Sequence, residues 1–275
     1  MTETRLTASS RTLDLGNRLA VTISEYGDAA ASGGRGLLVL HGGAGPQSVA
    51  GLAAALSQHA YVVVPTHPGF DGTPRPPWAD SVADLADAYL DLLDALGLSE
   101  VMVIGNSVGG WIASEMALRD IRGQVKSMVL INAVGIRPDN ATQLVDIRPL
   151  PPAAIGKLGF HNPAFRPDPA AMSEAQLAVM VANQQVLATY AGEQFMFAPK
   201  LRRRLHRVTV PVLVVWGEQD GVASADYGRS YAKTFANGHF QPIAEAGHLP
   251  HIEQPAAVLG AIADFANNVV EPGSD

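Results

Sequence analysis

The sequence predicts an α/β protein with a doubly wound, mostly parallel sheet that carries a helical lid insertion. Short apolar runs bounded by turn residues alternate along the chain with amphipathic helical patterns. Continuous apolar runs of this length are typical of strands buried on both faces, as in a parallel sheet. One proline-rich stretch, residues 134–207, interrupts the alternation and predicts the insertion.

A hairpin is expected first, with strands at Arg11–Leu15 and Leu19–Glu25 around Gly16-Asn17, because this pair favours a tight turn. Six buried strands are then expected, at Gly36–Leu40, Tyr61–Pro65, Val101–Gly105, Ser127–Asn132, Val212–Gly217 and Phe240–Ile243.

Helical patterns lie between these strands. Ser81–Leu96 places its apolar residues on one stripe, and Gly97 suits the residue that ends a helix. Further helices are expected at Ser107–Leu118, Asp226–Phe235 and Gln254–Asn267. Right-handed crossovers between parallel strands then give a doubly wound sheet.

The proline-rich stretch defines the predicted domain organisation. Residues 1–133 and 208–275 form the α/β core, and residues 134–207 form the lid. Ser173–Tyr190 is the best helix in the lid, with Ser173 and Gln176 spaced as a capping box. The alternative is two ordinary crossover helices with a long loop, but connections in compact domains are usually far shorter.

Composition excludes several classes of protein. Among 275 residues, 47% are hydrophobic and 16% charged, which excludes a disordered chain. The net charge of −7, with Arg202–Arg204 as the densest basic run, argues against a nucleic-acid partner. The absence of cysteine removes disulfides, thiolate zinc sites and cysteine nucleophiles. Neither a signal-peptide pattern nor a membrane-length apolar run is present, so we expect a cytoplasmic protein without a membrane partner.

Ser107 is the expected nucleophile. The segment Gly105-Asn106-Ser107-Val108-Gly109 fits the pattern G-x-S-x-G between an expected strand and an expected helix. This turn raises the serine hydroxyl above the sheet edge, beside the helix N-terminus. The alternative is a glycine-rich turn with a helix-capping serine, which the strand and helix on either side make less attractive.

A serine hydroxyl needs a general base, and His248 follows the last expected strand, at the carboxyl end of the sheet. The base needs an orienting carboxylate, and Asp220 follows the preceding strand, with Glu218 as a rival. Asn132, after the strand before that, is not an acid. His248 and His251 could form a metal pair, but no third ligand is recognisable, so no metal is expected.

Two backbone N–H groups are expected to hold the oxyanion. One belongs to Val108, directly after the serine, and the other to Gly43 in the loop His41-Gly42-Gly43-Ala44-Gly45-Pro46. This loop resembles a phosphate-binding loop, but the Lys-Ser/Thr of a P-loop is missing, which argues against a nucleotide.

The order Ser107, Asp220, His248, with His41-Gly42-Gly43 upstream, resembles the α/β-hydrolase superfamily. The resemblance runs from about Leu19 to Phe265. It includes His67-Pro68-Gly69-Phe70-Asp71-Gly72 and the histidine loop from Gly247 to Pro255. Serine at the nucleophile position argues against the haloalkane dehalogenases and epoxide hydrolases, which use aspartate there.

The turn around Ser107 and the His41-Gly42-Gly43 loop are also similar to those of the meta-cleavage-product hydrolases, which cut C–C bonds. Two positions depart from that group: Leu249 stands where its members have tryptophan, and Leu52 where they have asparagine. Arg148 or Arg166 could take the place of a carboxylate-binding arginine.

We therefore expect a serine hydrolase of the carboxylesterase type, acting on a small-molecule ester with a small or medium acyl group and without a cofactor. Apolar lid residues, among them Leu177, Val179, Met180 and Val186, would face the acyl pocket or pack on the core. The alternatives are a C–C hydrolase and a small-molecule binding protein derived from a hydrolase. The sequence leaves homo-oligomer formation open.

Overall fold

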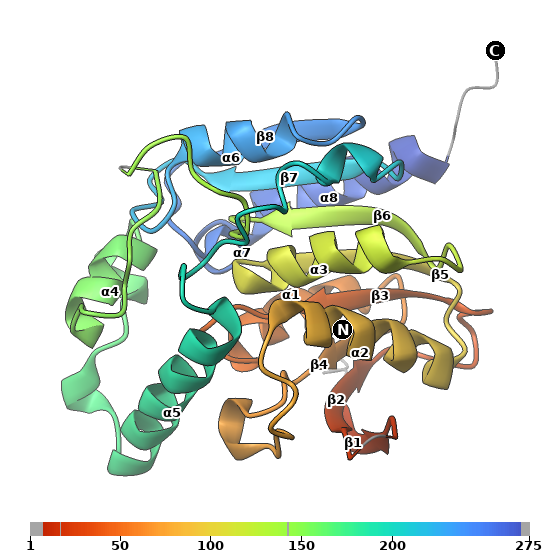
Figure 1. Cartoon of the computed structure of the whole chain (residues 1–275), viewed down its shortest axis with the longest axis horizontal. Helices are drawn as coiled ribbons and strands as arrows, with labels where there is room; N and C mark the ends of the chain where they lie inside the picture. Colours follow the sequence, from red (N-terminus) through yellow and green to blue (C-terminus); the bar gives the residue numbers. More distant parts are fainter. Residues whose placement is uncertain (1–7, 17, 142, 271–275) are drawn as a thin grey trace, which may run out of the picture.

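Eight strands form one twisted sheet in the computed structural model, which describes residues 8–16, 18–141 and 143–270 (Figure 1). The strand order is β1-β2-β4-β3-β5-β6-β7-β8. The strands are β1 (Ser9–Asp14), β2 (Ala20–Tyr26), β3 (Arg35–Leu40), β4 (Val62–Pro65), β5 (Glu100–Asn106), β6 (Val125–Ile131), β7 (Val212–Gly217) and β8 (Gly238–Ile243).

The predicted fold class is confirmed. The strands from β4 through β3, β5, β6 and β7 to β8 are all parallel, and β1 and β2 add an antiparallel edge. Asn17, in the predicted hairpin turn, and the N-terminal residues used for the signal-peptide expectation lie outside the described residues. No helix in the described part of the chain is long and apolar enough to cross a membrane.

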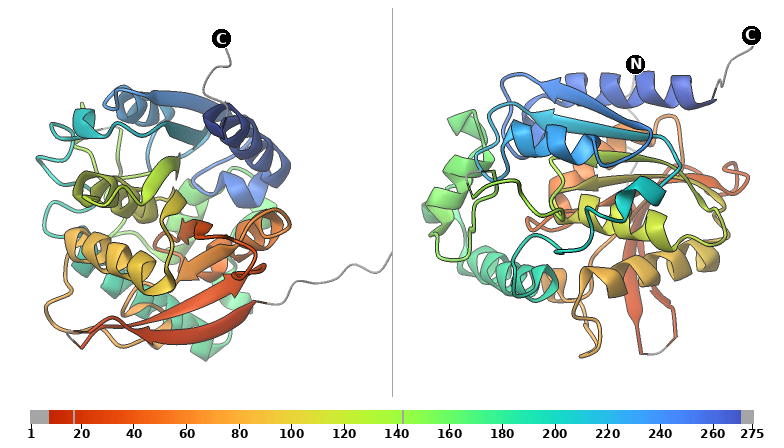
Figure 2. Two further views of the ribbon diagram at one scale, coloured as in Figure 1. Left: turned by 90° about the vertical axis from the view of Figure 1, so that its right-hand side faces the viewer. Right: turned by 45° about the horizontal axis from the view of Figure 1, so that its top comes forward.

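Helices cover both faces of the sheet (Figure 2). The main ones are α1 (Gln47–Leu56), α2 (Val82–Leu96), α3 (Val108–Arg119), α6 (Ala225–Ala232), α7 (Pro250–Glu253) and α8 (Pro255–Val270). The helix α1 was not predicted, because its alanine-rich sequence gives only a weak apolar stripe. The helix α6 ends at Ala232, three residues before the predicted end.

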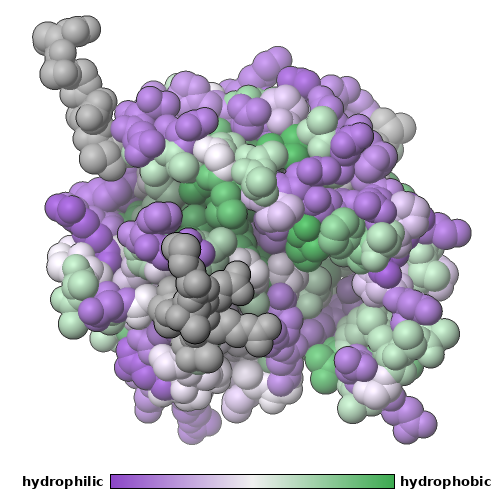
Figure 3. Space-filling view, turned by 180° about the vertical axis from the view of Figure 1, so that it is seen from behind, coloured by the Kyte–Doolittle hydropathy of each residue, from purple (hydrophilic) through white to green (hydrophobic). Residues whose placement is uncertain are grey.

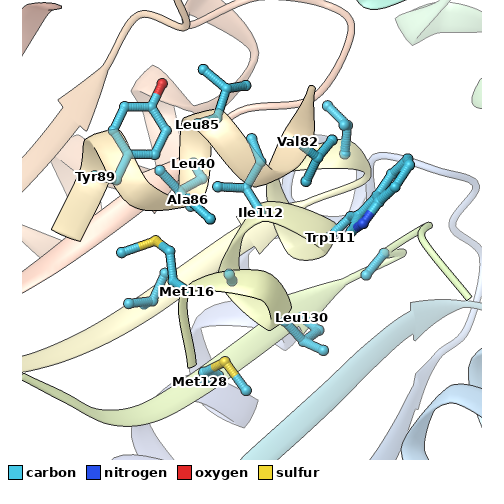
Figure 4. Close-up of a cluster of buried hydrophobic side chains, with 14 of the residues drawn as sticks. Leu40, Val82, Leu85, Ala86, Tyr89, Trp111, Ile112, Met116, Met128 and Leu130 are labelled. Atoms are coloured by element: carbon cyan, nitrogen blue, oxygen red, sulfur yellow. The ribbon is translucent and has the colours of Figure 1, made fainter. Parts of the chain in front are cut away.

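Alternation along the strands divides the core into two layers. Leu38 and Leu40 of β3 pack with α2, α3 and α6, whereas Val39 packs on the other face with α1 and α8. The first layer contains the cluster of Figure 4, in which Tyr89 of α2 and Met116 of α3 lie over the sheet. Both faces of the central strands are buried, which explains their continuous apolar sequences.

Between β6 and β7 the described residues form no strand of the sheet. They form α4 (Pro152–Gly159), α5 (Glu174–Ala191) and the short helical turns η2 (Pro163–Phe165), η3 (Pro169–Ala171) and η4 (Leu205–Arg207). A further short turn, η1 (Phe70–Gly72), follows β4. The capping box expected at Ser173 and Gln176 is present. We call residues 134–207 the insertion, and α4 and α5 lie beyond the carboxyl ends of the strands (Figure 1).

Three buried histidines fix the loops at this edge. His41 donates from Nδ1 to the Gly42 carbonyl oxygen (2.7 Å) and accepts at Nε2 from the His67 backbone N–H (3.0 Å). The His67 ring stacks on that of His41, with ring centres 3.7 Å apart. His251 of α7 donates from Nε2 to the Ser48 carbonyl oxygen of α1 (3.0 Å). Burial lowers the pKa of His41 and of His251 to about 4, and the pKa of His67 well below its ordinary value.

A groove of about 720 Å³ lies at the opposite edge of the sheet, where β3 and β5 begin. Leu37, Ala60 and Met102 contribute its apolar lining, and Arg35 and Glu100 are among its charged residues. On the back of the molecule, hydrophobic side chains lie in patches between hydrophilic ones, and some of them line the bottom of a hollow (Figure 3). The groove is at the amino ends of the strands, away from the loops that carry the predicted site.

The buried histidines predict a loss of stability in mild acid. Their lowered pKa means that, as pH falls from about 6.5 towards 4, the unfolded chain binds protons that the folded chain does not. The free energy of unfolding should fall by up to about 1.4 kcal/mol per pH unit for each such histidine. Denaturant titrations between pH 4.5 and 7.5 measure this slope. His251→Gln, whose amide can still donate to Ser48, should reduce the slope, and a slope equal to that of the wild-type protein would contradict the assignment.

A pair of glycine substitutions tests the end of α2. Gly97 has a φ of 67°, and a Cβ at this position would have nothing within 4 Å, so alanine there is strained by backbone conformation alone. We expect Gly97→Ala to lower the free energy of unfolding by about 1 kcal/mol. Gly51→Ala, in an open position inside α1, should raise it by roughly 0.5 kcal/mol. Chemical denaturation measures both, and equal effects of the two changes would contradict this account.

Candidate functional site

Ser107 lies in the sharp turn between β5 and α3. Its φ of 55° and ψ of −118° are a strained conformation for a residue with a side chain. The turn needs glycine on both sides. A Cβ at Gly105 would come 2.3 Å from the Gly109 carbonyl oxygen, and one at Gly109 would come 2.3 Å from that of Leu40. The chain thus holds the serine above the carboxyl end of β5, at the N-terminus of a helix.

His248 reaches Ser107 from the loop after β8. Its Nε2 lies 2.9 Å from Ser107 Oγ, and its Nδ1 lies 2.7 Å from Asp220 Oδ2. Because a carboxylate only accepts hydrogen bonds, Nδ1 carries the proton and Nε2 is left to accept from the serine hydroxyl. The structure therefore brings together the three side chains that the sequence singled out.

Asp220 is fully buried at its side chain and surrounded by donors. Its Oδ1 accepts from the backbone N–H groups of Val222 (2.7 Å) and Ala223 (3.0 Å). Glu218, the rival carboxylate, is exposed, and its backbone N–H pairs with Ile243. The hydrogen bonds leave the Asp220 carboxylate in a fixed orientation towards His248.

Asn132 is a site residue that the sequence reasoning missed. Its Nδ2 donates to Asp220 Oδ2 (2.7 Å), the oxygen that His248 also contacts, and its Oδ1 accepts from the Gly217 N–H (3.1 Å). Its φ is 46°, a conformation that asparagine tolerates better than most residues. The signal is present in the sequence, since Asn132 directly follows a buried strand, but an amide cannot serve as the orienting carboxylate, and its role as a donor to that carboxylate has no local signature.

The loop after β3 lies against Ser107. A Cβ at Gly42 would come 2.9 Å from the Ser107 Cβ. The Gly42 carbonyl oxygen accepts from His41 Nδ1 and from the Gly45 N–H (3.2 Å). In a trans peptide the next N–H points the opposite way, so these bonds direct the Gly43 N–H away from His41. Val108 is the first residue of α3, where a backbone N–H has no acceptor within the helix.

The helix α5 covers this loop. A Cβ at Gly43 would come 2.6 Å from Leu187 Cδ2, which places the leucine directly on the loop. Asn183 donates to Asp71 Oδ1 and accepts from the Asp71 N–H, both at 2.8 Å, and Tyr190 donates to the Pro68 carbonyl oxygen (2.8 Å). The second half of α5 is thus attached to the loops after β3 and β4.

The apolar residues named for the insertion do not share one environment. Val186 lies near Gly69, whereas Val179 is 43% exposed. Leu177 and Met180 are half-buried. Leu187, which the sequence reasoning did not single out, is in direct contact with the loop of Gly43.

The two arginines considered for carboxylate binding already have partners. Arg148 donates to both oxygens of Asp146 and lies over the Phe195 ring, 4.6 Å from its centre. Arg166 donates to the carbonyl oxygens of Phe160 and His161. Within the described part of the chain, no group of three or more His, Asp or Glu side chains is arranged to hold a metal ion.

Comparisons with known proteins agree with this architecture. The chain is 27% identical to a pimeloyl-[acyl-carrier protein] methyl ester esterase of Vibrio cholerae, over 78% of this chain and 87% of the esterase. Its structure resembles that of a membrane phospholipase A, with a TM-score of 0.81 and 23% identity over 97% of this chain and 88% of the phospholipase. It also resembles the meta-cleavage product hydrolase of Pseudomonas fluorescens IP01, with a TM-score of 0.76 and 20% identity over 94% and 97% of the two chains.

Residues 37–261 match the model of the alpha/beta hydrolase family. That range contains the turn of Ser107, the loop of Asp220 and the loop of His248, as well as the insertion. The eight-stranded sheet and the sequence match lead to the same conclusion: this chain belongs to the alpha/beta hydrolase family.

Proposed function

We propose that this protein is a serine hydrolase that cleaves uncharged carboxylic esters through an acyl-enzyme. The observation that carries the proposal is the hydrogen-bonded chain from Ser107 Oγ through His248 to Asp220, with distances of 2.9 Å and 2.7 Å. A nucleophile beside a base, with the base oriented by a third group, is the arrangement that acyl transfer needs.

In this mechanism Ser107 attacks the ester carbonyl while His248 accepts the hydroxyl proton at Nε2. Asp220 holds the imidazole through Nδ1 and stabilises its charged form. The N–H groups of Gly43 and Val108 bind the oxyanion, and such a donor contributes on the order of 3 kcal/mol to transition-state stabilisation. His248 then returns the proton to the leaving alcohol, and water repeats the attack on the acyl-enzyme.

The charge distribution favours an uncharged substrate. Arg148 and Arg166 are engaged by an aspartate and by carbonyl groups, so neither is available for a substrate carboxylate without breaking these bonds. The residues of α5 that face the loops after β3 and β4 include Asn183, Val186 and Leu187, and none of these carries a charge. The esterase relative supports ester hydrolysis, whereas the likeness to the meta-cleavage product hydrolase is a likeness of fold.

Covalent labelling tests the nucleophile. A fluorophosphonate probe should add once to the wild-type protein, on Ser107, because His248 activates that hydroxyl. Ser107→Ala should lose the adduct and at least about 10³-fold of the esterase rate. The matched control is Ser114→Ala, since Ser114 is also buried on α3 but bonds to Gly110 and Tyr231. Intact mass and peptide mapping give the result. A folded wild-type protein that takes no label, yet binds small molecules tightly, would favour the binding-protein alternative.

A substrate panel separates ester from C–C hydrolysis. We expect p-nitrophenyl acetate and butyrate to be turned over with a kcat/KM at least 100-fold above that for a dienoic ring-fission product. The reason is that Arg148 and Arg166, the two arginines considered for a substrate carboxylate, already bond to Asp146 and to the Phe160 carbonyl oxygen. Release of nitrophenol and loss of the dienoate absorbance measure the two rates. The reverse ranking would replace the ester proposal with the C–C alternative.

A further inference from the structure

Glu253, at the end of α7, is a buried carboxylate that accepts hydrogen bonds from two separate parts of the chain. Its Oε2 accepts from the Gly247 N–H (2.6 Å) and the His161 N–H (3.3 Å), and its Oε1 accepts from the Asn162 N–H (2.7 Å). The residue is 7% exposed. Among the residues that the structure describes, no Lys, Arg or His side chain forms an ion pair with it, so these backbone donors compensate its charge.

The two parts that Glu253 joins are the histidine loop and the insertion. Gly247 directly precedes His248, while His161 and Asn162 follow α4. The His248 N–H in turn donates to the Gly159 carbonyl oxygen (2.8 Å). The two segments also approach closely, since a Cβ at Gly247 would come 2.6 Å from the Gly159 oxygen. Hydrogen bonds therefore run in both directions between residues 159–162 and residues 247–253.

The same end of α4 contacts the loop of Asp220. The Gly221 N–H donates to the Leu158 carbonyl oxygen (3.0 Å). The backbone around both His248 and Asp220 is thus held in part by α4. By contrast, α5 is attached through the side chains of Asn183, Leu187 and Tyr190.

We propose that Glu253 is a positioning residue for His248, and that it makes the end of α4 part of the frame that holds the imidazole. It acts on the reaction through Gly247 and does not touch the substrate. This inference rests on the proposed function, because it assigns the consequence of the contact to the general base. It also implies that any opening of the insertion takes place at α5, since movement of α4 would displace His248.

Glu253→Gln tests the assignment at nearly constant side-chain size. One terminal atom becomes an NH₂ group, which cannot accept from a backbone N–H. If it replaces Oε2, Gly247 and His161 lose their acceptor; if it replaces Oε1, Asn162 loses its acceptor, so either orientation weakens the link between the two segments. We expect kcat for esters and the rate of Ser107 labelling to fall at least 10-fold, with KM changed less than 3-fold. The control is Glu115→Gln, because Glu115 is a similarly buried glutamate that pairs with Arg119 and Arg204. It should lower stability and leave kcat within 2-fold.

A second pair of variants cuts the link from the insertion and leaves Glu253 in place. Asn162→Pro removes the donated N–H at a residue whose φ of −79° proline can adopt. Asn162→Ala keeps that N–H and loses only the side-chain cap on Ala164. We expect Asn162→Pro to lower kcat more than Asn162→Ala does, even if Glu253→Gln fails to fold.

Hydrogen exchange provides a readout that does not depend on activity. In Glu253→Gln, the amides of residues 158–162 and of residues 245–249 should both exchange faster than in Glu115→Gln. Faster exchange in one segment alone, or a kcat no lower than that of Glu115→Gln, would overturn the inference. A wild-type protein that neither hydrolyses esters nor labels at Ser107 would refute the proposed function instead, while the exchange result would still decide whether Glu253 joins the two segments.

Discussion

The candidate site depends on backbone hydrogen bonds that continue the parallel ladder one residue beyond the strands. The Ser107 N–H donates to Ile131 at the end of β6, and the Asn132 N–H donates to Val215 of β7. The Glu218 N–H donates to Ile243 at the end of β8 in the same way. Each loop therefore leaves the sheet from a fixed point. Side chains far apart in the sequence meet because their strands end in register at one edge.

The chain around Ser107 shows how packing makes this register possible. Gly105 and Gly109 let strand, turn and helix approach to a separation that a single Cβ would prevent. The strain of Ser107 is held in place by this contact and by the ladder on both sides of β5. The geometry of the hydroxyl is thus a property of the sheet as much as of the serine.

Much of the fold could be predicted from local sequence. The six parallel strands are predicted within two residues of their observed ends. Five of them are largely buried and apolar on both faces, whereas β8 is the edge strand of the sheet, and its His239 and Gln241 are exposed. The helix α2 was equally clear, with Ser81 and Gly97 at its ends. The helix α1 was not, since its alanines fit a helix without marking one face. The pairing of β2 with β4 also has no local signal in the sequence. These two strands are separated along the chain by β3 and α1, so their pairing depends on the arrangement of the whole sheet.

The residues of the candidate site also differ in whether local sequence predicts them. Ser107, Asp220 and His248 could be located because each follows a strand and has a distinctive side chain. The roles of Asn132 and Glu253 could not be predicted, because they depend on partners whose positions only the folded chain defines. The partner of Asn132, Asp220, is 88 residues away. The partners of Glu253 include Gly247, 6 residues away, and His161, 92 residues away. Arg148 shows the reverse case, in which a residue considered for a ligand is held by Asp146, two positions earlier.

The attachment of α5 differs from that of α4 in how it responds to solvent conditions. The helix α5 carries no charged side chain after Glu174, and it is held by apolar contact and by the hydrogen bonds of Asn183 and Tyr190. Contacts of this kind respond weakly to ionic strength and more strongly to temperature and cosolvents that alter the burial of apolar surface. The cover over the Gly43 loop therefore depends on temperature and cosolvents more than on the screening of charges by salt.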